Sequence, residues 1–136
     1  MLMQERMKHR NIVLHCKIPD DTPVITGMPG KLEQVFINLL TNAVDALEKQ
    51  DNGEITVEMF SHPDQIIISF SDNGCGMVPK IRKRIFDPFF TTKEHGKGTG
   101  LGMPIIKTII EEHKGAISCQ SRPGKGTTFT IMLPVK

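Results

Sequence analysis

The spacing of apolar residues changes along this chain from a helical repeat to an alternating one and then back. After Pro29, apolar residues recur every three or four positions, as on the buried side of a helix (Leu32, Val35, Phe36, Leu39, Leu40, Ala43 and Leu47). Pro29 suits the first turn because a helix leaves that N–H unbonded, and Asp51-Asn52-Gly53 is expected to end the helix. Residues 54–61 and 65–71 are rich in β-forming residues and flank a Ser-His-Pro-Asp turn. A chain with both patterns must pack helices against a sheet.

The other segments continue this mixture without a regular alternation of strand and helix. Residues 12–18 alternate as a strand, and residues 24–26 are expected to form a second, short one. Residues 103–113 carry a second apolar helix, and residues 116–122 and 127–133 form a last hairpin. The sequence therefore predicts an α+β fold built as a two-layer sandwich.

Length and charge set the broad class of the protein. The 136 residues suffice for one domain with its own core, which we place at residues 11–136. Residues 1–10 are charged and rich in methionine, and we expect them to be the remnant of an upstream helix. The net charge of +2, with scattered basic residues, argues against a nucleic-acid partner. Short apolar runs and the lack of a leader pattern favour a cytoplasmic domain.

The cysteines and histidines show no metal-binding pattern. Cys16, Cys75 and Cys119 are odd in number, lie far apart and form no CxxC pair. Reduced thiols in a cytoplasm are therefore expected, rather than a disulfide framework or a zinc site. The five histidines lack ligand spacing as well.

Two clusters of polar residues stand out against this background. Asn38, Asn42 and Asp45 are spaced so that they share one stripe of the first helix. Because asparagine is a mediocre helix former, this stripe indicates either a solvated face or a face that contacts a ligand. In "SFSDNGCGM" a strand runs directly into Asp72 and two nearby glycines. This is either a turn or a site of close approach, where Asp72 accepts a hydrogen bond from an amine such as that of adenine.

Four glycines alternate between Gly96 and Gly102, immediately before the second helix. The run matches neither the Walker A loop nor the Rossmann fingerprint. It nevertheless lies at a helix N-terminus, where free N–H groups and the helix dipole favour a phosphate. Lys93 and Lys97 add positive charge. We expect a flexible lid that closes over an anionic ligand.

The motifs together resemble a known family. "EQVFINLLTNAVDAL", "DNGCGM", "IFDPFFTTK" and "GKGTGLGM" are similar to the N, G1, F and G2 boxes of the ATP-binding catalytic domain of sensor histidine kinases, in the family's order. Their wording resembles nitrogen-regulatory and sporulation-type kinases. The resemblance implies the Bergerat fold, a mixed sheet of about five strands with helices on one face. It also implies an ATP pocket between helices, beneath a mobile lid over residues 87–99.

The resemblance further implies roles for individual residues. Asn42 would coordinate Mg²⁺, with Asn38 facing the phosphates, and Asp72 would bind the adenine amine; Lys93 would contact a phosphate. Catalytic roles fall to Asn38, Asn42 and Lys93. Phe86 and its neighbours Phe89 and Phe90 are expected to anchor the lid in the core. The residues implied to contact the nucleotide are Asn38, Asn42, Asp45, Asp72, Gly74, Gly76, Met77, Lys93, Gly98, Thr99, Gly100, Leu101 and Gly102. Lys97 departs from the family pattern, and its role stays open.

The activity implied is that of a protein-histidine kinase domain in two-component signalling, using ATP and Mg²⁺. The γ-phosphoryl group would pass to a histidine on a separate dimerisation domain. None of the five histidines here has the acceptor's sequence context, so we expect the acceptor upstream, outside this chain. The domain alone would be monomeric and unable to autophosphorylate, whereas the full-length kinase would be a homodimer. A response regulator is the expected downstream partner, and a protein inhibitor is a further candidate. The signal, the response regulator and any membrane anchor of the parent are left open.

Two alternatives use the same fold. ATPases such as gyrase, MutL and a heat-shock chaperone use a glutamate base at the position of Asn38, and an amide cannot accept that proton. The nearest glutamate, Glu33, would project from a different face of the helix. An anti-sigma serine kinase or a pure binding module is also about this short, but the "FDPFF" box favours the histidine kinase.

Overall fold

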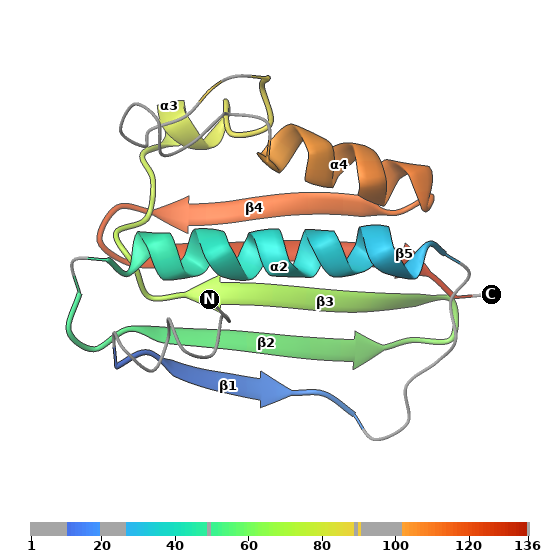
Figure 1. Cartoon of the computed structure of the whole chain (residues 1–136), viewed down its shortest axis with the longest axis horizontal. Helices are drawn as coiled ribbons and strands as arrows, with labels where there is room; N and C mark the ends of the chain where they lie inside the picture. The colour runs from blue at the N-terminus through green and yellow to red at the C-terminus, as the bar shows by residue number, and fades with distance from the viewer. Residues whose placement is uncertain (1–10, 20–26, 49, 89, 91–101, 136) are drawn as a thin grey trace.

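The computed structural model describes residues 11–19, 27–48, 50–88, 90 and 102–135. Within them lie five strands and three helices (Figure 1). In chain order they are β1 (Val13–Lys17), α2 (Pro29–Ala46), β2 (Glu54–Ser61), β3 (Gln65–Asp72), α3 (Pro79–Arg82), α4 (Gly102–Glu112), β4 (Ala116–Arg122) and β5 (Gly126–Pro134). Three expectations fall outside the described residues: the upstream helix remnant, the short strand at 24–26, and the lid between residues 91 and 99.

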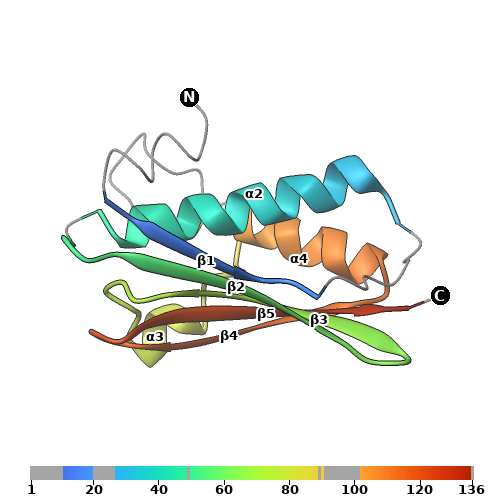
Figure 2. The same cartoon turned by 90° about the horizontal axis from the view of Figure 1, so that it is seen from below.

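The strands form one mixed sheet in the order β1-β2-β3-β5-β4. β1 pairs with β2 in parallel, and the other three pairs are antiparallel. The parallel pair follows from the long crossover through α2, whereas tight turns join the antiparallel neighbours β2–β3 and β4–β5. Figure 2 shows α2 and α4 together on one face of this sheet. The predicted two-layer α+β architecture is therefore confirmed.

The core lies between that face and the two long helices. α2 buries Leu32, Val35 and Leu39 against residues of β3 and β5, and α4 adds Ile106, Ile109 and Ile110. A second, smaller cluster joins the end of α2 to β2 (Ile12, Ala43, Val44, Leu47 and Ile55). The apolar stripe predicted for the first helix therefore faces the core, with Phe36 and Leu40 at its half-buried margin.

α2 ends at Ala46, earlier than the expected stop at residues 51–53. Its last turn tightens, because the N–H of Leu47 bonds to the carbonyl of Val44 rather than to a carbonyl four residues back. Leu47 then turns into the smaller core cluster, where it is 1% exposed. Burial of this leucine ends the helix before the turn residues do.

Among the described residues, no helix is long and apolar enough to cross a membrane.

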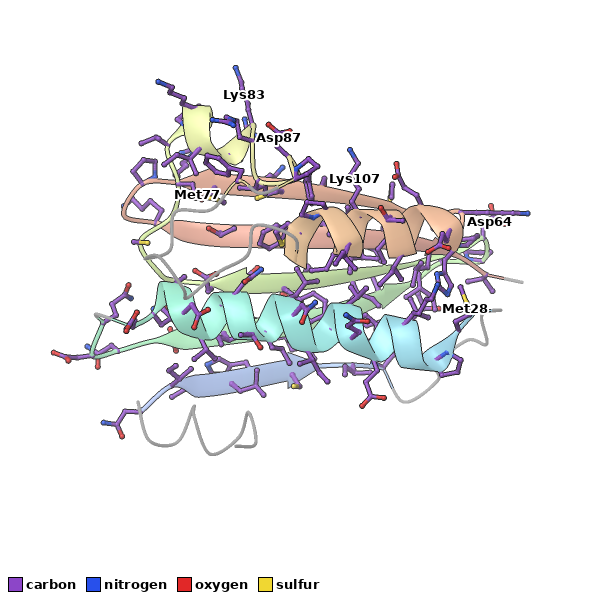
Figure 3. The ribbon with its side chains drawn as sticks, turned by 45° about the horizontal axis from the view of Figure 1, so that its top comes forward. Met28, Asp64, Met77, Lys83, Asp87 and Lys107 are labelled. Atoms are coloured by element: carbon purple, nitrogen blue, oxygen red, sulfur yellow. The ribbon has the colours of Figure 1, made fainter. Side chains whose placement is uncertain are left out.

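A buried histidine joins the two long helices at one end of the molecule. His113, directly after α4, has its Nδ1 2.8 Å from the carbonyl oxygen of Ile109. Its Nε2 accepts a hydrogen bond of 2.9 Å from the N–H of Met28, which immediately precedes α2 (Figure 3). An imidazole that accepts at Nε2 carries its proton on Nδ1, so Nδ1 donates to Ile109. Gly27 lies so close that an added Cβ would be 2.6 Å from the imidazole ring.

Candidate functional site

Asp72 ends β3 on the face that the helices cover. Side chains alternate along a strand, and the buried Ile66, Ile68 and Phe70 place Asp72 on the core side. Its Oδ1 accepts a hydrogen bond of 2.9 Å from the N–H of Gly74. Burial raises the pKa of the Asp72 carboxyl above 3.8, and backbone hydrogen bonds from Gly74 and Thr127 oppose that rise. Asp72 is thus a partly desolvated acceptor that the backbone holds in one orientation.

This carboxyl group opens into a pocket of about 580 Å³. Of the predicted site residues that the structure describes, only Asp72 lines it. The other lining residues belong to α3 and the β4–β5 hairpin (Arg82, Cys119, Gln120, Ser121, Arg122, Lys125, Gly126, Thr127 and Thr128). The volume lies within the range of pockets that hold small organic molecules. A smaller hollow of about 200 Å³ lies elsewhere, beside Asp64 and Lys114, and none of the predicted site residues lines it.

Asn42 projects from α2 toward the start of α4. Its Nδ2 donates a hydrogen bond of 3.1 Å to the thioether sulfur of Met103. A thioether has no proton to give, so the amide must present its NH₂ end there and its Oδ1 points elsewhere. Asn38 lies one turn earlier on α2 and is half-buried, as are Asn42 and Asp45. Of the predicted polar stripe, Asn42 therefore contacts the first turn of α4, which begins at Gly102.

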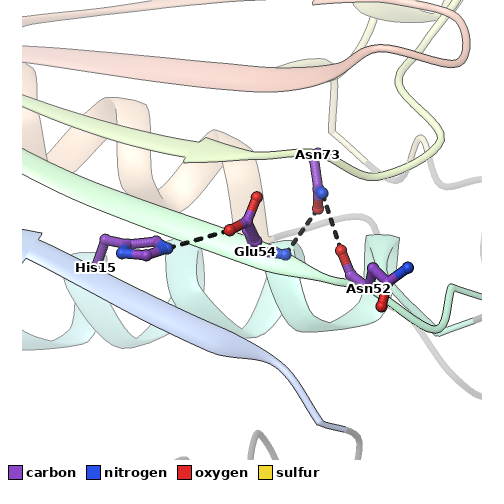
Figure 4. Close-up of polar contacts among 4 residues, drawn as sticks. All are labelled: His15, Asn52, Glu54 and Asn73. Carbon is purple, nitrogen blue, oxygen red and sulfur yellow. Dashed lines mark hydrogen bonds and ion pairs between the residues drawn. The ribbon is translucent and has the colours of Figure 1, made fainter.

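Asn73, next to Asp72, is occupied by structural contacts (Figure 4). Its Oδ1 accepts a 2.7 Å hydrogen bond from the N–H of Glu54, and its Nδ2 donates to the carbonyl of Asn52 at 3.0 Å. Its own carbonyl accepts from Nε2 of Gln50 at 2.6 Å. Asn73 therefore ties the end of β3 to the connection between α2 and β2.

The two glycines of the same motif are required by the packing of the protein itself. A Cβ on Gly74 would lie 2.7 Å from the carbonyl oxygen of Ala46, at the end of α2. Gly76 has φ +69°, and a Cβ there would collide with the carbonyl of Arg122. Close approach of backbone to backbone thus accounts for both residues. Their predicted contact with a nucleotide base stays a prediction.

The β4–β5 hairpin is hydrogen-bonded to the segment that follows Asp72. The N–H of Met77 donates to Oγ of Ser121 at 2.8 Å, and the N–H of Gly124 donates to the carbonyl of Cys75 at 2.7 Å. Figure 3 shows Met77 in the connection between β3 and α3. Ser121 is not among the site residues that the sequence predicts. The sequence could have indicated that Ser121 needs a partner, because a hydroxyl at a core-facing position of a strand must form a hydrogen bond.

The described residues include only part of the predicted lid. Lys93, Gly98, Thr99, Gly100 and Leu101 all lie outside them. Of the three phenylalanines expected to anchor the lid, Phe86 packs against the main core, and Phe89 lies outside the described residues. Phe90 is half-buried beneath the Arg84 guanidinium, 4.6 Å from the ring centre.

Comparison with known proteins agrees with this geometry. Residues 27–136 match the family described as histidine kinase-, DNA gyrase B-, and HSP90-like ATPase. Sporulation kinase E of Bacillus subtilis is 41% identical over 135 residues, which are 99% of this chain and 18% of that protein. The sensor histidine kinase ZraS of Salmonella typhi is 42% identical over 135 residues, 98% of this chain and 28% of that protein.

A solved structure carries the comparison to the fold. The catalytic domain of histidine kinase ThkA superposes with a TM-score of 0.84 at 30% identity, over 98% of this chain and 86% of that one. The chain spans less than a third of the length of the two curated relatives. The family match covers most of the chain, and the fold is that of a kinase catalytic domain. The chain therefore belongs to the histidine kinase-, DNA gyrase B- and HSP90-like ATPase family, as the catalytic domain of a sensor histidine kinase related to the sporulation kinases.

Proposed function

We propose that this domain binds Mg-ATP and donates the γ-phosphoryl group to a histidine on a separate dimerisation domain. The observation that carries the proposal is the half-buried Asp72 carboxyl, held by Gly74 at the edge of a pocket large enough for a purine. A carboxylate accepts strongly from the exocyclic amine of adenine, and a partly desolvated one accepts more strongly still.

The amide oxygen of Asn42 is the proposed protein ligand for Mg²⁺. The Met103 sulfur occupies the NH₂ end of this amide, which leaves Oδ1 for a hard cation. The described residues contain no group of three or more histidine, cysteine or acidic side chains that could hold a metal. Phosphate oxygens and water would therefore complete the shell, as is usual for Mg²⁺. The ion, when bound, supplies charge neutralisation for the triphosphate.

The side chains of α2 favour transfer to a protein over hydrolysis. Asn38 stands where a hydrolytic relative would need a carboxylate base, and its amide cannot take a proton from water. Glu33 is exposed and lies five residues earlier, about 140° around the helix from Asn38. The ATPase alternative of the gyrase and MutL class is therefore disfavoured. An anti-sigma serine kinase remains the second candidate, because it needs the same pocket and a different acceptor.

In the proposed reaction an imidazole nitrogen attacks the γ-phosphorus. The new phosphorus–nitrogen bond forms as the bond to the β,γ-bridging oxygen breaks, and ADP leaves with that electron pair. Positioning and charge stabilisation supply most of the catalysis in such a step. The acceptor domain, a response regulator and a cytoplasmic setting belong to the proposal, since relatives extend well beyond the region matched here.

Transfer in trans tests this function. The chain is incubated with γ-labelled ATP and Mg²⁺, with and without a two-helix dimerisation domain of a related kinase or the same domain lacking its histidine. Label should appear only on the intact acceptor, in an acid-labile, base-stable linkage. Rapid phosphate release without an acceptor would favour the ATPase class, and acid-stable label on a protein serine would favour the anti-sigma class.

Asn42→Ala should abolish this transfer while adenosine, which binds no Mg²⁺, keeps most of its affinity. Gln34→Ala is the matched control, because it removes an exposed amide from the same helix. Equal losses of adenosine and Mg-ATP binding would show that Asn42 supports the pocket rather than the metal.

A further inference from the structure

Ser121 is the centre of a hydrogen-bond junction beside the predicted adenine site. Its Oγ accepts from the N–H of Met77 at 2.8 Å and donates to the carbonyl of Gly126 at 3.0 Å. A third contact, of 2.9 Å, joins it to Oγ1 of Thr127. Residues 72, 127 and 121 are register partners across β3, β5 and β4, so their side chains form one row on the helix-covered face.

The three contacts fix the direction of every proton in the junction. A serine hydroxyl has one proton to donate and two lone pairs that accept. The proton of Ser121 goes to the Gly126 carbonyl, because a carbonyl can only accept. The Thr127 hydroxyl must therefore donate its own proton to Ser121. The Thr127 hydroxyl is left with lone pairs alone for any further partner.

Thr127 and Asp72 both line the pocket, and both face it as acceptors. Thr127 is 7% exposed, so an unsuitable partner at its oxygen could not be replaced freely by bulk water. Two neighbouring acceptors match an exocyclic amine, which has two protons to donate. They mismatch a carbonyl oxygen at the same place, because neither side then supplies a proton.

We propose that Ser121 determines base specificity, by holding the Thr127 hydroxyl as an acceptor and by fixing the Met77 backbone beside it. The pocket thereby selects a purine with an amine at position 6 over one with an oxo group. This inference rests on the adenine site proposed above and adds a residue of the pocket wall whose hydroxyl is fully engaged by protein partners. Ser121 is a positioning residue that acts through Thr127.

The opposite face of the same strands provides a matched control. There, Ser71 and Thr128 form a hydroxyl pair of the same length, 2.9 Å, one residue along each strand. Side chains alternate between faces, so this pair points away from α2 and α4. Ser71→Ala removes an equivalent hydroxyl and an equivalent hydrogen bond without touching the Ser121 junction. Ser71 itself does not line the pocket, although its partner Thr128 does.

The experiment measures affinities for ADP and IDP by calorimetry, since these nucleotides differ only at the 6-position and the N1 proton that accompanies the oxo group. The unaltered chain should prefer ADP. Ser121→Ala should weaken ADP roughly tenfold and leave IDP unchanged or slightly tighter, because the freed Thr127 hydroxyl can rotate and donate. Ser71→Ala should keep the ADP/IDP ratio of the unaltered chain. Thr127→Val, which keeps the shape of the side chain, should lower the ADP/IDP ratio as Ser121→Ala does. The double variant with both changes should lower the ratio little further.

Ser121→Thr restores the hydroxyl and should recover the ratio, which a packing role alone would not predict. Asp72→Asn separates the two proposals. If Asp72→Asn weakens ADP while Ser121→Ala and Thr127→Val both keep the full ADP/IDP ratio, the specificity role of Ser121 is wrong and the adenine site stands. If Asp72→Asn leaves both affinities unchanged, the adenine site itself is misplaced. Should Ser121→Ala fail to fold in a melting assay, Thr127→Val decides the matter by the same ratio.

Discussion

Two adjacent polar residues at the end of β3 have different roles, one in the structure and one in the candidate site. Asn73 uses its side-chain oxygen, side-chain nitrogen and carbonyl in contacts with residues 50–54, so its role is structural. Asp72 has its carboxyl in a pocket, where burial makes the charged form less favourable. A protein keeps such a costly carboxylate most readily where a ligand uses it. The difference between the two lies in what surrounds them. The sequence singles out Asp72 as a candidate acceptor but does not show the structural contacts of Asn73.

Asp72→Asn should weaken ADP by about 1.5–3 kcal/mol while the fold persists, because a charged acceptor is replaced by a neutral amide. Asp51→Asn, an exposed aspartate to asparagine change, is the control. Calorimetry would remove Asp72 from the adenine site if the two variants bound ADP equally.

The raised pKa of Asp72 gives this site a pH dependence of definite sign. Because folding raises the pKa above 3.8, the folded state favours the protonated form. The contribution of Asp72 to stability is therefore greatest below pH 3.8 and is lost as pH rises through the raised value. ADP binding should follow the opposite course and weaken as pH falls through that value, since the neutral carboxyl is a poorer acceptor. Titrating ADP affinity against pH should show this step in the unaltered chain and lose it in Asp72→Asn.

The three cysteines should differ in reactivity. Burial raises the pKa of the Cys119 thiol to about 11, whereas Cys16 and Cys75 are exposed. The thiolate is the reactive form, so iodoacetamide at pH 8 should label Cys16 and Cys75 first and Cys119 last. Peptide mass spectrometry over a time course gives the order. Early labelling of Cys119 would mean that its pocket opens to solvent far more than the structure indicates.

Helices and strands differ in how much of them can be predicted from sequence. The strands at 54–61 and 116–122 and the two long helices follow from local periodicity, and the structure has them within a few residues. α3 has four residues, too few for a periodic signal. The pairing of β3 with β5 joins segments about sixty residues apart, and no local pattern contains it.

The candidate site likewise contains residues that the sequence indicates and residues that it does not. Asp72 stands in a motif of adjacent residues and Asn42 in a stripe with helical spacing, so the sequence alone draws attention to both. The partners of Ser121 are Met77, 44 positions away, and Gly126 and Thr127 at the start of β5. Such a junction exists only after the sheet has brought the two segments together, and its role could not be predicted from spacing.

At the scale of the helices, His113 is a single side chain that joins the end of α4 to the start of α2. His113→Ala would leave the Met28 N–H without its partner and create a cavity beside Gly27. The free energy of unfolding should fall by about 2–4 kcal/mol. His62→Ala, at an exposed turn, should change it by less than about 0.5 kcal/mol. Denaturant unfolding that gives equal values for the two variants would mean that the helices are held together without this contact.

On the scale of the whole molecule, the stabilising contact and the candidate site occupy opposite ends. The end of α2, the end of β3 and the β4–β5 turn gather at one end (Figure 1). The His113 contact joins the start of α2 to the end of α4 at the other. The pocket end is built from turns and element termini, which tolerate rearrangement better than a packed helix pair does. A lid that orders on binding would therefore leave the core undisturbed.

We predict that residues 91–100 gain order when a triphosphate binds. Glycine occupies four of seven positions from residue 96 to 102, and residues 91–100 include no large apolar side chain to hold them in the core. Phosphate contacts from backbone N–H groups, Lys93 and Lys97 are the compensation that the sequence offers for ordering them. Hydrogen exchange of the free chain, the ADP complex and a non-hydrolysable ATP complex is the measurement. Protection in this segment should rise most with the γ-phosphate, while the buried amides of α4 near Ile109 serve as an internal reference that should stay constant. Protection already high in the free chain and unchanged by nucleotide would show that the glycines form a fixed turn. The prediction of a lid would then be wrong.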